Sequence, residues 1–178
     1  MDTQFPARRF AHVMAVITLM GAVALPIFQG GAWIFLDEFT ALGVDDWGFS
    51  FDAASISTPA RIAGFLVAVS SACIQAFGLM AVRATFMEAA LGRALSLRAV
   101  VQFRRFAWIS VVMVFVGIIQ NSAYSVIFSW GNPEGSRQLE IEFGSNELST
   151  LFVALLFMFV AHVFATGRKI EEENATFI

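Results

Sequence analysis

Four long stretches of this chain contain no Asp, Glu, Lys or Arg: residues 10–36, 62–82, 106–133 and 148–167. A helix that rises about 1.5 Å per residue needs roughly 20 apolar residues to cross a hydrocarbon core of about 30 Å. Lipid offers no hydrogen bonds to a backbone, so a spanning segment must be a helix that satisfies its own polar groups. The sequence therefore predicts an all-α membrane protein, a four-transmembrane-helix bundle in one integral membrane domain, with spans at approximately 10–36, 60–91, 97–130 and 147–168.

Composition agrees with this class. The 178 residues are 58% hydrophobic and 14% charged, whereas a soluble domain carries about 25% charged residues. The net charge of -3 gives no reason to expect direct binding of nucleic acid. Cys73, the single cysteine, falls within the second span, so neither an intramolecular disulfide nor a cysteine metal cluster is possible.

The charges outside the spans predict an orientation. Nine of the eleven basic residues lie before the first span, between the second and third, or after the fourth: Arg8, Arg9, Arg83, Arg93, Arg98, Arg104, Arg105, Arg168 and Lys169. The other two connections hold Arg61, Arg137 and most of the acidic residues. Basic residues accumulate on the cytoplasmic side of membrane proteins. We therefore expect both termini and the connection 83–105 in the cytoplasm.

The N-terminal segment has a second interpretation. Arg8 and Arg9 followed by an apolar run and by residues 22–24 (Ala-Val-Ala) resemble a signal peptide with its cleavage site. The apolar run, however, continues to Phe35, and a cleaved signal has a core of only about 7–15 residues. We expect a retained helix.

The connection between the second and third spans has helix-ending signals. Gly92 stands where a C′ residue would end one helix, and Ser96 can cap the next. A cytoplasmic hairpin is therefore expected, its arginines near the lipid headgroups. These arginines are either part of a docking surface for a cytoplasmic partner, or they fix topology and contact anionic lipid.

The other two connections show alternating patterns. Trp47, Phe49 and Phe51 alternate with polar or small residues, and a second alternating run follows at Leu139, Ile141 and Phe143. Such alternation predicts half-buried strands, so a small outer β-ribbon is possible. The alternative is aromatic anchoring at the membrane interface.

The spans offer little chemistry. We find no Ser/His/Asp arrangement, glycine-rich phosphate loop or metal-spaced cluster, and we expect no enzyme activity and no cofactor. Polar side chains could line a ligand cavity or could form interhelical hydrogen bonds: Gln29, Gln75, Gln120 and Asn121. His12 and His162 lie toward the cytoplasmic side of the first and fourth spans. If those helices are neighbours, the two imidazoles could ligate haem, although chance would also supply two histidines.

Three sequence features carry a resemblance to a known family. They are the four-span layout, the basic stretch 92–108 (with Gly92, Leu95, Ser96, Phe103, Arg104, Arg105 and Trp108) and the ending 167–178. Over nearly its full length the chain resembles the bacterial membrane family catalogued as domain of unknown function 2975. Ile170 stands where that family usually has Leu. The resemblance implies no enzyme activity and no site residues. It suggests a component of the bacterial cytoplasmic (inner) membrane that senses or sequesters a small helix-turn-helix transcriptional regulator.

Two classes of function stay open. In the first, the chain is a non-enzymatic membrane component, and the hairpin and the C-terminal tail form a docking face: Arg93, Arg98, Arg104, Arg105, Arg168, Lys169, Glu171, Glu172 and Glu173. In the second, it binds or transports a small apolar or zwitterionic ligand in the candidate cavity defined above. Homo-oligomers are compatible with either class.

Overall fold

The computed structural model describes residues 4–42, 56–131, 139–141 and 143–176. Its helices are α1 (Gln4–Ile34), α2 (Leu36–Ala41), α3 (Thr58–Ala90), α4 (Leu97–Ser129) and α5 (Ser145–Thr176). Helices α1, α3, α4 and α5 each contain a segment long and apolar enough to cross a membrane. The predicted all-α fold with four spanning helices is confirmed.

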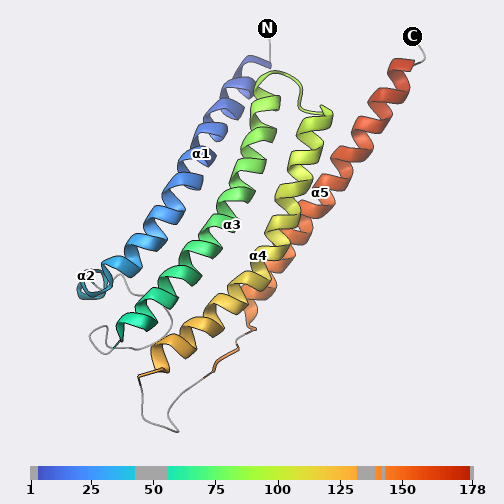
Figure 1. The fold of residues 1–178 in the computed structure, drawn as a ribbon. Helices are drawn as coiled ribbons and strands as arrows, with labels where there is room; N and C mark the ends of the chain where they lie inside the picture. The colour runs from blue at the N-terminus through green and yellow to red at the C-terminus, as the bar shows by residue number, and fades with distance from the viewer. Residues whose placement is uncertain (1–3, 43–55, 132–138, 142, 177–178) are drawn as a thin grey trace.

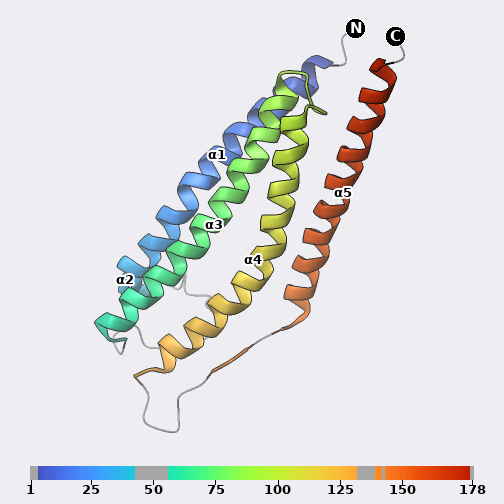
Figure 2. The same ribbon diagram turned by 45° about the vertical axis from the view of Figure 1, so that its right-hand side comes forward.

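The long helices pack in the order of the chain, as an open bundle. Helix α1 packs on α3, α3 on α4 and α4 on α5, and within the described residues α1 and α5 are not in contact. Both views show α1 and α5 at opposite edges (Figures 1 and 2). The N-terminus, the C-terminus and the α3–α4 connection lie at one end, with α2 at the other (Figure 1). We call these the hairpin end and the α2 end.

The helices are longer than the uncharged stretches. Helices α3 and α4 contain 33 residues each, or about 50 Å at 1.5 Å per residue, so they extend beyond a hydrocarbon core of about 30 Å. Helix α5 continues past the expected boundary at 168 to Thr176. Ion pairs of i,i+4 spacing support this extension, one between Arg168 and Glu172 and one between Lys169 and Glu173. The acidic tail is therefore helical as far as Thr176.

The hairpin between α3 and α4 forms as predicted. Gly92 has a φ of +77°, its N–H donates to Ala89 O, and the N–H of Arg93 donates to Glu88 O. These two bonds define a Schellman motif with glycine at C′. The Ser96 hydroxyl accepts a hydrogen bond of 3.1 Å from the N–H of Ala99 and so caps α4.

The outer β-ribbon is not shown. Residues 139–141 and 143 have no regular secondary structure, and Leu139, Ile141 and Phe143 are exposed. The N–H of Glu140 instead donates to the Ser125 hydroxyl on α4, at 3.0 Å. The other expected strand, at Trp47–Phe51, lies outside the described residues.

An aromatic cluster joins α1, α3 and α4 near the α2 end. Trp33 stacks on Phe128 with ring centroids 5.7 Å apart and lies 5.4 Å from the ring of Tyr124. Gly64 of α3 lies directly under the indole, because a Cβ added there would be 2.1 Å from it. Leu36 is fully buried in the same cluster. Glycine thus permits the close approach of α1 and α3.

Candidate functional site

A buried carboxylate organises the hairpin end. The Glu88 side chain is 8% exposed and accepts a hydrogen bond of 3.0 Å from the Ser96 hydroxyl. Arg93 Nε lies 3.3 Å from one carboxylate oxygen, and Arg98 Nη1 lies 4.0 Å from the other. A buried charge is tolerated when it is paired in this way. Arg93 and Arg98 therefore hold the turn, in addition to any role at the surface.

The hairpin and the C-terminal part of α5 border a shared open hollow. Its volume is about 590 Å³, and its lining includes Arg93, Ala94 and Ser96 from the hairpin with Arg168, Glu171 and Glu172 from α5. We call this the hairpin–tail hollow. It brings together four of the residues expected at the docking face, with both signs of charge around one space.

The remaining docking candidates lie elsewhere. Lys169 and Glu173 pair with each other and do not line the hollow, and Arg98 is held near Glu88. Arg104 and Arg105 line a different space, a groove between α3 and α4. The described residues thus place four of the nine candidates around the hairpin–tail hollow and two along the groove between α3 and α4. Among the long helices, the described part of α5 packs on α4.

The four candidate cavity residues are also separated. Gln75 lines a largely apolar cavity of about 230 Å³ between α3, α4 and α5, with Ser110 and Thr150. Gln120 instead donates a hydrogen bond of 2.8 Å to the Tyr124 hydroxyl on its own helix. Gln29 is half-buried and Asn121 is exposed, and neither lines this cavity. Within the described residues, the cavity at Gln75 therefore contains one of the four candidates.

The histidines do not face each other. His12 is on α1 and His162 is on α5, at opposite edges of the bundle, and these two helices are not in contact in the described residues. His12 lines a surface space with Arg8 and Met87, while His162 is exposed. The haem hypothesis was conditional on neighbouring helices, and the described parts of α1 and α5 do not meet that condition.

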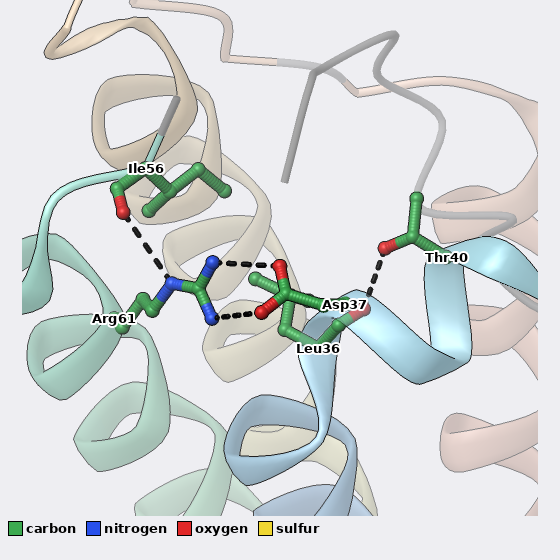
Figure 3. Close-up of polar contacts among 5 residues, drawn as sticks. All are labelled: Leu36, Asp37, Thr40, Ile56 and Arg61. Atoms are coloured by element: carbon green, nitrogen blue, oxygen red, sulfur yellow. Dashed lines mark hydrogen bonds and ion pairs between the residues drawn. The ribbon is translucent and has the colours of Figure 1, made fainter. Parts of the chain in front are cut away.

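An ion pair that the sequence analysis missed fixes the α2 end. Arg61 of α3 donates two hydrogen bonds to the Asp37 carboxylate of α2, at 2.7 and 2.9 Å, and a third to Ile56 O at 3.3 Å (Figure 3). Thr40 donates to Leu36 O across the same turn (Figure 3). The two parallel hydrogen bonds fix the orientation of the Arg61 guanidinium relative to the Asp37 carboxylate. The sequence could have predicted this ion pair, because Arg61 is an isolated basic residue in an acidic connection.

The Asp37 pair predicts a pH dependence. The hydrogen bonds from Arg61 hold the pKa of the Asp37 carboxyl below its ordinary value. The pair therefore stabilises the fold at neutral pH, and this contribution is lost as the pH falls through the lowered pKa. The Asp37→Asn variant should show a smaller loss of thermal stability between neutral and acidic pH than the parent protein. Glu38→Gln, at the adjacent acid, is the control and should follow the parent. Identical acid profiles for Asp37→Asn and the parent would contradict the pair.

Comparison with known proteins supplies no further constraint. No family model, curated protein or solved structure matches this chain.

Proposed function

We propose that this chain is a non-enzymatic protein of the bacterial cytoplasmic membrane that holds a small cytoplasmic protein at its hairpin end. In this proposal both termini and the α3–α4 hairpin face the cytoplasm. Their location at one end of the helices is consistent with this orientation (Figure 1), and the excess of basic residues there favours the cytoplasmic side.

The observation that carries the proposal is the hairpin–tail hollow. Two segments far apart in the sequence, the hairpin and the end of α5, line it together. Its lining contains two basic side chains, Arg93 and Arg168, and two acidic side chains, Glu171 and Glu172. A surface of mixed charge selects a partner by electrostatic complementarity more than by apolar burial. The resemblance stated above suggests a small helix-turn-helix regulator as that partner.

Two neighbouring acids provide a matched test. Glu171 lines the hollow, whereas Glu173 does not. A photo-crosslinking residue at Ala94, in the hollow, should capture a small helix-turn-helix protein in cells. Glu171→Lys should abolish this adduct, and Glu173→Lys should leave it at the parent level. An unchanged adduct in Glu171→Lys, or capture of lipid alone at Ala94, would contradict the docking proposal.

The cavity at Gln75 favours a second candidate function, binding of a small apolar or zwitterionic ligand. This cavity lies between three helices and contains the polar groups of Gln75, Ser110 and Thr150. Mass spectrometry of an extract from the purified protein would then detect a retained small molecule. Gln75→Leu should reduce its amount, and Asn121→Leu, outside the cavity, should not. An extract with no such molecule would remove this candidate.

A further inference from the structure

The seam between α3 and α4 carries a groove of about 710 Å³ that changes character along the helix axes. Arg104 and Arg105 line its part toward the hairpin end, while Phe77, Met80 and Trp108 line its deeper part. Trp108 follows Arg105 by three residues, or about 4.5 Å along α4. Phe77 precedes Ala84, another lining residue, by about 10 Å along α3. The groove is therefore cationic toward the hairpin end and apolar toward the middle of the two helices.

The two arginines differ from four other cations of the hairpin end. Arg93 and Arg98 pair with Glu88, Arg168 pairs with Glu172, and Lys169 pairs with Glu173. Arg104 and Arg105 are exposed and make no hydrogen bond or ion pair with any residue that the structure describes. Two arginines at consecutive positions of α4 therefore line a largely apolar groove. The described part of the chain does not compensate their charge.

We propose that this groove binds one anionic phospholipid. The phosphate would lie between Arg104 and Arg105, since the guanidinium fork matches phosphate oxygens in geometry and charge. One acyl chain would follow the groove past Trp108 toward Phe77, which is 72% exposed. Trp108 would lie near the headgroup boundary, where tryptophan is enriched in membrane proteins.

Charge complementarity selects this occupant. A zwitterionic lipid carries its own cation and would leave the arginine pair less well compensated. An apolar helix from a second copy would cover Phe77 and Trp108 but would bring no anion to the arginines. The proposal concerns a site for lipid on α3 and α4, apart from the hairpin–tail hollow.

The test measures lipid preference of the full chain in detergent by native mass spectrometry. The parent should retain phosphatidylglycerol in preference to phosphatidylcholine at a stoichiometry of one. Arg104→Gln/Arg105→Gln should reduce this preference by about 30-fold, because each basic residue near an anionic surface is worth about a fivefold change in affinity. Arg104→Lys/Arg105→Lys keeps the charge and should retain most of the preference.

The matched control removes two other cations from the same end. Arg9→Gln/Lys169→Gln changes the net charge equally; both side chains are exposed, and neither lines the groove. This variant should keep the parent preference. An equal loss in both glutamine pairs would show diffuse attraction and overturn the site, as would a parent protein without preference.

A measurement on the unmodified chain guards against a variant that fails to fold. Phosphatidylglycerol with a photoreactive acyl chain should crosslink to peptides covering residues 77–84 and 101–109, which line the groove. Crosslinks spread evenly over all four long helices, or a dimer that excludes the lipid from these peptides, would overturn the proposal.

Discussion

Gly64→Ala should strongly destabilise the protein, although it adds a single methyl group. That methyl would lie 2.1 Å from the indole of Trp33. The indole cannot easily move, since it is 2% exposed and packs against Tyr124 and Phe128. Overpacking a core costs about 1–3 kcal/mol and occasionally more, and we expect the upper part of this range because α1 and α3 must separate. Thermal unfolding of the detergent-solubilised protein measures the loss.

Gly117→Ala is the matched control for Gly64→Ala. A Cβ at Gly117 meets no atom within 4 Å, so this variant should match the parent or exceed it slightly. Removing the indole provides a second check. In a Trp33→Leu background, Gly64→Ala should cost much less, since the two side chains act on the same space. Equal costs of Gly64→Ala in both backgrounds would mean that Trp33 and Gly64 do not pack as described.

Val114→Arg should sharply reduce the amount of protein in the membrane. Val114 lies near the middle of α4 and is buried against its neighbours. An arginine at the centre of a spanning helix costs about 2.5–3.5 kcal/mol on insertion scales. Helix α4 itself contains no acidic residue that could pair with this arginine. Quantitative immunoblotting of isolated membranes measures the effect.

Ala94→Arg is the control for Val114→Arg. Ala94 is exposed in the turn between α3 and α4, so the same arginine should be tolerated there. Equal membrane levels of both variants would contradict the assignment of α4 as a spanning helix.

Hydropathy and capping rules predicted much of the fold. The uncharged stretches located all four long helices, and Gly92 and Ser96 marked the ends of α3 and α4 correctly. These features are local, because the length of an apolar run and the chemistry of a cap depend on neighbouring residues alone. The sequence analysis considered only the charge of the acidic tail. It overlooked the i,i+4 spacing of Arg168 and Glu172, which favours the extension of α5 to Thr176.

The candidate sites were harder to predict because they depend on which helices are neighbours. Hydropathy does not determine which helices pack against each other. In the open bundle, the described parts of α1 and α5 are not in contact. The sequence therefore could not place His12 relative to His162, or the four polar cavity candidates relative to one another. Isolated charges would have been better guides. Glu88 stands alone among basic residues in the connection 83–105, and Arg61 stands alone in an acidic one. Each marks an ion pair that fixes one end of the bundle.

The proposed orientation can be tested most directly by labelling single cysteines in intact cells. In a Cys73→Ser background, Ser145→Cys places a thiol at the start of α5, and Ala94→Cys places one in the hairpin. Both positions are exposed, at opposite ends of the long helices. A membrane-impermeant thiol reagent should label position 145 in intact cells and position 94 only after permeabilisation. Labelling of position 94 in intact cells, or equal labelling of both positions, would contradict a cytoplasmic hairpin end.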